Sequence, residues 1–155
     1  MKMIESYTRE LEALLSCGDT AGPVTAASIE TAEKELGVVF PESYRLFLER
    51  FGAAVCGLAD IAGIFEHPDP DRCPYWQDVV ALTKQVRRVS RGQIPTSYIP
   101  ICDDGGDCMF YLDTAQLTEN GECPVVVLGP GRDGIVAADG FAEFAVRWIK
   151  KDLEY

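Results

Sequence analysis

The side chains best suited to nucleophilic or acid–base chemistry lie close together in one short stretch of the sequence. His67 is the only histidine, Glu66 precedes it and Cys73 follows it. A cysteine and a histidine in hydrogen-bond contact would form an activated nucleophile. However, the sequence around Cys73 carries no motif of the cysteine enzymes, and its prolines and aspartates indicate a loop. We therefore expect a chance proximity and predict that the protein is not an enzyme.

Six cysteines raise the question of a zinc site or of disulfides. They are Cys17, Cys56, Cys73, Cys102, Cys108 and Cys123. Zinc is disfavoured because there is no Cys-x-x-Cys pair and only one histidine. The start of the chain has no apolar run typical of an export signal, so we expect reduced, buried or half-buried thiols. A disulfide between Cys102 and Cys108, across a turn, is the minor alternative.

A long acidic stretch is the strongest candidate for binding. Residues 92–131 contain no lysine or arginine but hold Asp103, Asp104, Asp107, Asp113, Glu119 and Glu122. On a hairpin, such carboxylates could occupy the places that phosphates take in the basic cleft of a nuclease, because arginine pairs with both groups in the same bidentate way. The alternative is that aspartate and glycine are there for the local hydrogen bonds and backbone angles of a turn.

An aromatic residue within the acidic stretch, Tyr98, could anchor an interface or pack in the core. The predicted partner-binding residues are Asp103, Asp104, Asp107, Asp113, Glu119 and Tyr98. Calcium binding is less favoured, because residues 103–107 lack the alternating ligand spacing and the distal glutamate of an EF-hand loop. We predict no metal and no cofactor.

The charge of the whole chain restricts the class of partner. The formal net charge of −11 disfavours nucleic acid and anionic membranes, both of which attract lysine and arginine. An acidic protein associates fastest with a basic protein. No apolar stretch approaches the ~20 residues that cross a bilayer. We therefore expect a cytoplasmic protein that binds another protein, not nucleic acid or a membrane.

The first half of the chain has the spacing of helices that must position these residues. Apolar side chains recur at intervals of three and four, which is typical of helices with one buried face. Helices are predicted over residues 4–15, from Thr25 or Ser28 to Leu36, from Pro41 to Phe51 and over 75–89, with a strand near 58–65.

The second half has the pattern of short strands and turns. Strands are predicted over residues 98–102, 108–112, 123–128 and 134–138. Asp139 is expected to cap a closing helix that buries Phe141, Phe144 and Trp148. Helices, then a meander, then a helix indicate a single α+β domain over residues 1–155. Its central sheet would be antiparallel, or mixed, with helices packed mainly on one side.

Three blocks of sequence resemble a known family, in the same order and over about residues 28–150. Leu36–Leu48 reads LGVVFPESYRLFL and is similar to the signature LG-x-x-(L/F)-P-x-x-Y-x-x-FL of the SUKH superfamily. Ile101–Asp113 resembles that family's acidic, glycine-bearing hairpin ending in LD, and Val136–Phe144 resembles its A-x-S-F-x-E-F helix entry. The superfamily takes in the yeast cell-wall synthesis regulator and many bacterial immunity proteins.

The resemblance implies an α+β fold with a partner-binding face. It also implies neutralisation of a toxin, often a nuclease, that bacteria use against competitors. Together with the acidic stretch, it predicts an immunity-type protein that occludes the basic active-site surface of a polymorphic toxin. The alternative is an intracellular regulatory or scaffold protein of the kind of the yeast relative. A large secreted toxin encoded by the adjacent gene would favour the first function over the second.

Overall fold

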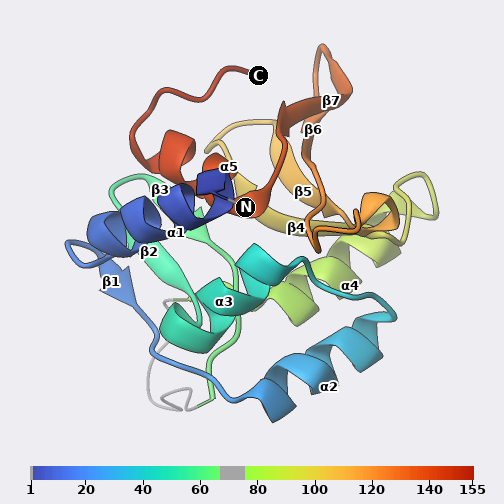
Figure 1. Ribbon diagram of the computed structural model, residues 1–155. Coiled ribbons are helices and arrows are strands. Elements are labelled where there is room, and N and C mark those ends of the chain that lie inside the picture. Colours follow the sequence, from blue (N-terminus) through green and yellow to red (C-terminus); the bar gives the residue numbers. More distant parts are fainter. Residues whose placement is uncertain (1, 67–75) are drawn as a thin grey trace.

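The computed structural model describes residues 2–66 and 76–155, and Figure 1 shows their arrangement. Its helices are α1 (Lys2–Leu15), α2 (Ala26–Leu36), α3 (Glu42–Phe51), α4 (Val79–Ser90), the 3₁₀ turn η1 (Thr114–Gln116) and α5 (Phe141–Ile149). Its strands are β1 (Asp19–Thr20), β2 (Ala54–Cys56), β3 (Ala59–Ile61), β4 (Tyr98–Asp103), β5 (Met109–Asp113), β6 (Val125–Gly129) and β7 (Arg132–Ala138). The loop residues His67 and Cys73 lie outside the described residues.

The strands form two antiparallel sheets, which confirms the predicted α+β class. The larger sheet has the order β4-β5-β6-β7, as the meander predicted. A smaller sheet, β1-β2-β3, stands beside it, and only one of its strands was expected from the sequence. The N–H of Ala62 donates to the carbonyl of Ile101 at 2.8 Å and so joins the two sheets at β3 and β4.

Helix ends follow local capping chemistry, with two differences from the sequence prediction. Helix α2 begins where expected, because the Thr25 hydroxyl accepts from the N–H of Ser28 at 3.2 Å. Helix α4 begins later than predicted, because the carboxylate of Asp78 caps it by accepting from the N–H groups of Val80 and Ala81. The prediction that Asp139 caps α5 was wrong.

The N-terminus of α5 is arranged differently. Gly140 occupies the cap position, and no side chain accepts a hydrogen bond there. The carboxylate of Glu143, one turn into the helix, instead accepts from the N–H of Asp139 at 3.2 Å. The glutamate thus fixes the chain entering the helix, as in the second half of a capping box.

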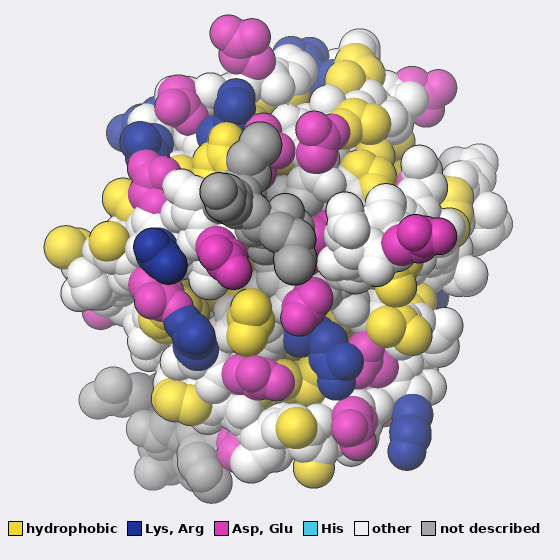
Figure 2. All heavy atoms as spheres, viewed as in Figure 1, with side chains coloured by type: hydrophobic (Ala, Val, Ile, Leu, Met, Phe, Trp, Pro, Cys, Tyr) yellow, Lys and Arg dark blue, Asp and Glu magenta, His cyan; other side chains and the backbone are white. Residues whose placement is uncertain are grey.

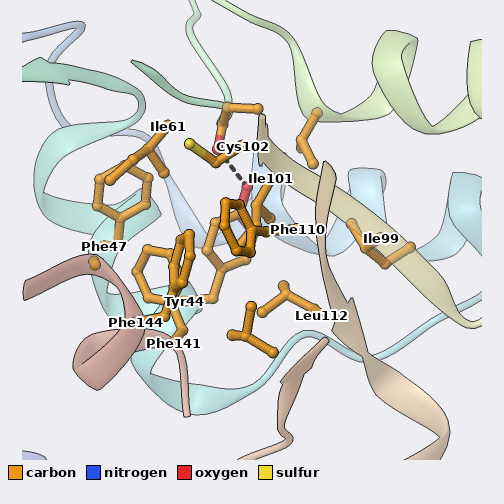
Figure 3. Close-up of a cluster of buried hydrophobic side chains, with 14 of the residues drawn as sticks. Tyr44, Phe47, Ile61, Ile99, Ile101, Cys102, Phe110, Leu112, Phe141 and Phe144 are labelled. Carbon is orange, nitrogen blue, oxygen red and sulfur yellow. Dashed lines mark hydrogen bonds between the residues drawn. The ribbon is translucent and has the colours of Figure 1, made fainter. Parts of the chain in front are cut away.

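The core lies between the inner face of the larger sheet and helices α3 and α5, and Figure 3 shows its centre. The ring of Tyr44 lies 4.9 Å from that of Phe141, and Phe110 of β5 lies 4.9 Å from Phe144. The hydroxyl of buried Tyr44 donates to the carbonyl of Ala62 at 2.7 Å. Burying each such aromatic side chain contributes about 1.5–3 kcal/mol, so this cluster holds the sheet and helices as one unit.

The remaining helices surround this core. Helices α1 and α5 run side by side, while α2 contacts both α3 and α4 (Figure 1). Helix α4 packs on the edge strand β4. Within residues 2–66 and 76–155, none of the helices combines the length and the apolar character needed to span a membrane.

Candidate functional site

The turn between β4 and β5 holds three of the predicted residues, Asp103, Asp104 and Asp107. One carboxylate oxygen of Asp103 accepts from the N–H of Gly105 at 2.8 Å. One oxygen of Asp104 accepts from Gly106 at 2.8 Å. These bonds are those of Asx-turns, in which an aspartate satisfies the backbone two residues on. Asp103 and Asp104 therefore do form the local hydrogen bonds expected of turn residues, and these bonds make the turn rigid.

Asp104 is held most firmly of the three. The oxygen that faces Gly106 also accepts from the N–H of Cys108 at 3.2 Å, and the other oxygen accepts from the hydroxyl of Tyr155 at 3.2 Å. Burial by itself would raise the pKa of Asp104, but these hydrogen bonds outweigh it and lower the pKa. Asp104 is therefore ionised at neutral pH, and the C-terminal residue of the chain is fastened to the turn.

A fourth carboxylate, Asp60 of β3, lies in the smaller sheet next to the turn. Burial, and then the negative charge of Asp103, raises the pKa of Asp60. One of its carboxylate oxygens is buried without a hydrogen-bond partner. Sequence reasoning missed this residue, because only the docking of β3 beside β4 brings it to the site. We name Asp60, Asp103, Asp104 and Asp107 the acidic end.

Within residues 2–66 and 76–155, no ion pair joins a lysine or arginine to the acidic end. The ion pairs among the described residues join other carboxylates to bases: Glu33–Arg45, Glu12–Arg50, Glu35–Lys84, Glu143–Arg147 and Glu10–Lys150. Arg132 of β7 donates instead to the carbonyl of Tyr155 at 2.9 Å and lies over the ring of that residue. Asp107 is exposed, so the acidic end presents a carboxylate to solvent.

The other predicted residues lie elsewhere. Asp113 is at the far end of β5, is only 4% exposed, and accepts from the side-chain amide of Gln116 at 2.5 Å. Glu119 is exposed in the loop between η1 and β6. Tyr98 begins β4, directly opposite Asp113. The structure therefore brings together only the three aspartates of the turn, and it leaves little access to Asp113.

Acidic side chains are also spread over other parts of the surface. On the face shown in Figure 2, magenta acidic side chains stand among dark blue basic ones and form no single patch. This intermixing agrees with the ion pairs along α1, α2 and α5. This face therefore has mixed charge, in contrast to the acidic end, where no ion pair of the described residues is found.

The described cysteines are free, as the sequence predicted, and all but Cys17 are buried or half-buried; Cys17 is exposed, so that part of the prediction was wrong for it. Cys73 lies outside the described residues. Burial raises the pKa of Cys102 and of Cys123 to about 12. Cys102 pairs with Phe110 across the hairpin, so it does not face Cys108. Among residues 2–66 and 76–155, no three histidine, cysteine or acidic side chains are placed to hold a metal ion.

An α+β domain with an ionised, rigid turn beside its central sheet is the class of structure that these observations define. The family model SUKH_5, described as SMI1-KNR4 cell-wall, matches residues 1–150. The chain therefore belongs to the SUKH_5 family, and the resemblance seen in the three sequence blocks is confirmed. No curated protein matches the chain. The family includes immunity proteins and SMI1/KNR4-like proteins. Membership of this family implies that the chain interacts with other proteins.

Proposed function

We propose that this protein is a cytoplasmic immunity protein that binds a basic toxin domain and blocks its active-site surface, without turning over a substrate. The observation that supports it most directly is the acidic end. There, Asp103, Asp104 and Asp107 carry charge that the ion pairs of the described residues leave uncompensated. Carboxylates gathered on one turn suit the arginines and lysines of a nuclease cleft.

The rigidity of the turn supports the mechanism. The N–H of Gly105 already donates to Asp103, and those of Gly106 and Cys108 donate to Asp104. The two aspartate side chains therefore lose little conformational freedom when a partner binds. Preorganisation of this kind increases affinity by reducing the entropy lost on binding. Long-range attraction from the net charge of −11 adds to the association rate.

Neutralising the turn while keeping its hydrogen bonds tests the proposal. Asn has the same acceptor oxygen as Asp, so Asp103→Asn and Asp104→Asn retain the Asx-turn bonds, and Asp107→Asn removes an exposed charge. The protein should be co-expressed in bacteria with the toxin domain encoded beside its gene. Protection by the wild type and its loss in the triple variant would support the proposal. Full protection by the triple variant would refute the role of the acidic end.

The second candidate is a regulatory or scaffold protein related to cell-wall synthesis, and the match to a family described as SMI1-KNR4 cell-wall favours it. Deleting the gene separates the two functions. Cells that lose the protein should be killed by the neighbouring toxin under the first function. Under the second, they should instead show altered sensitivity to cell-wall-damaging agents in the absence of any toxin.

A further inference from the structure

The outer face of the larger sheet carries a second apolar layer, separate from the core. Tyr111 of β5 and Val126 of β6 are opposite one another and are 4% and 2% exposed, yet neither belongs to the core cluster. Val136 of β7 continues the row and is 52% exposed. Beside Tyr111, a hollow of about 400 Å³ opens between the sheet and α4. This face is therefore apolar and partly accessible.

Tyr98 reaches across this face, which shows that the sheet is curled. Strands β4 and β7 are the two edges of the sheet. Even so, the hydroxyl of Tyr98 on β4 lies only 3.7 Å from a methyl group built on Gly134 of β7. Flat neighbouring strands are about 4.8 Å apart, so the edges would otherwise be too distant for this contact. The curl makes the outer face concave, with the half-buried Tyr98 ring 5.7 Å from the ring of Tyr111.

Two carboxylates lie near this aromatic pair. Asp113 lies directly across from Tyr98 on β5, and exposed Asp133 precedes Gly134 on β7. Burial, and after it the charges of Asp113 and Asp133, raises the pKa of Tyr98. Two cations near this face are engaged with the backbone: Arg132 donates to the carbonyl of Tyr155, and Arg87 of α4 donates to the carbonyls of Leu36 and Thr96. An aromatic face beside an exposed carboxylate is complementary to a cation.

We propose that the concave face formed by Tyr98, Tyr111 and Asp133 receives an arginine side chain of the protein partner. The guanidinium stacks on the ring of Tyr98 and pairs with the carboxylate of Asp133, while its alkyl stem covers Val136. Arginine suits this place better than lysine, because its planar guanidinium stacks on a ring and is more weakly hydrated. This inference rests on the proposed function in taking the occupant to be a basic protein.

The probe for this test is a hexa-arginine peptide, with hexa-lysine as its matched comparison. Binding is read by NMR at the ring protons of Tyr98 and Tyr111 in the full chain. Hexa-arginine should shift both rings and bind more tightly than hexa-lysine. Asp133→Asn should weaken binding several-fold, and Tyr98→Leu by about fivefold, the size of an exposed cation–π contact. Tyr98→Phe keeps the ring and should bind within about twofold of the wild type.

Two further results decide the outcome. Glu30→Gln, an exposed position on α2 with no proposed binding role, should leave the shift of the Tyr98 ring unchanged. Equal affinity for the two peptides, or binding at the tyrosine rings that survives both Tyr98→Leu and Asp133→Asn, would overturn the arginine site. Asp133→Asn changes an exposed side chain and so stays informative even if Tyr98→Leu unfolds. Because no toxin is present, failure here leaves the protection experiment, and with it the proposed function, separately testable.

Discussion

Glu122 and Ser43, 79 residues apart in the chain, form the N-terminal cap of α3. The carboxylate of Glu122 accepts from the N–H of Ser43 at 3.0 Å and from its hydroxyl at 2.5 Å. Pro41, at the cap position itself, offers no side-chain acceptor. The N–H of Glu42 donates in addition to the carbonyl of Gly121. The loop before β6 therefore closes the start of the helix that carries Tyr44 into the core.

Removing this cap should destabilise the protein. Glu122→Ala leaves the N–H of Ser43 buried without a partner, and we expect a loss of about 1–3 kcal/mol in the free energy of unfolding. Urea denaturation provides the measurement. Glu119→Ala, in the same loop but exposed, is the matched control and should stay within about 0.5 kcal/mol of the wild type. Equal stability of the two variants would contradict the capping role.

The same carboxylate should make stability depend on pH. Burial raises the pKa of Glu122, the bonds from Ser43 partly oppose this, and the charge of Glu42 adds to it. The folded state therefore binds this proton more tightly than the unfolded chain does. Its contribution to stability is fully present below the unfolded pKa, near the ordinary value of 4.5, and is lost as pH rises through the higher folded pKa.

Comparing the wild type with Glu122→Gln isolates that contribution. Glutamine cannot titrate, so the stability of the wild type relative to this variant should fall as the pH is raised from 4 to 7. Urea midpoints at several pH values give the difference. A difference that is constant, or that rises with pH, would show that the pKa of Glu122 is not raised.

Thiol reactivity should separate the cysteines by their burial. Cys17 is exposed, whereas Cys102 and Cys123 are buried and have pKa values of about 12, so almost no thiolate forms there. Iodoacetamide at pH 8 should label Cys17 in the native protein. It should label the other two only after denaturation. Peptide mass spectrometry reads each site, and native labelling of Cys123 would contradict the described core.

Close backbone contact should make one glycine irreplaceable. A methyl group built on Gly63 would overlap the carbonyl of Gly52, which already accepts from the N–H of Ile64 at 2.9 Å. Since the backbone at Gly63 or at Gly52 must move, Gly63→Ala should lower the free energy of unfolding by about 1–3 kcal/mol or more. A methyl group on Gly140 would make only an ordinary contact with the carboxylate of Glu122, so Gly140→Ala should lower the free energy of unfolding by less than about 1 kcal/mol. Thermal unfolding of both variants tests this ranking.

Much of the fold follows from patterns that act locally. The three- and four-residue spacing of Tyr44, Phe47 and Phe51, and the alternation around the Asp103–Asp107 turn, reflect the periods of helix and strand. These patterns predicted the α+β class and the meander. The start of α4 was missed, because its cap Asp78 lies inside a run whose apolar spacing continues back to Trp76.

The candidate site was predictable only in part, for a physical reason. The turn aspartates are adjacent in sequence, so their grouping could be read directly. Asp60 joins them through the docking of β3 on β4, and Asp133 approaches Tyr98 through the curl of the sheet. Contacts between segments that are distant in the chain produce no local residue pattern, so a single sequence does not reveal them. The separation of Asp113 from the turn, by the length of β5, likewise required the structure.

The most direct test of the account compares two charge-neutralised variants for binding to the toxin domain encoded by the neighbouring gene. One combines Asp103→Asn, Asp104→Asn and Asp107→Asn. The other combines Glu30→Gln, Glu49→Gln and Asp152→Asn, three exposed positions elsewhere, and changes the net charge equally. Calorimetry at 150 mM salt should show the first variant weakened at least tenfold and the second by less than threefold, whereas equal affinities would contradict recognition through the acidic end.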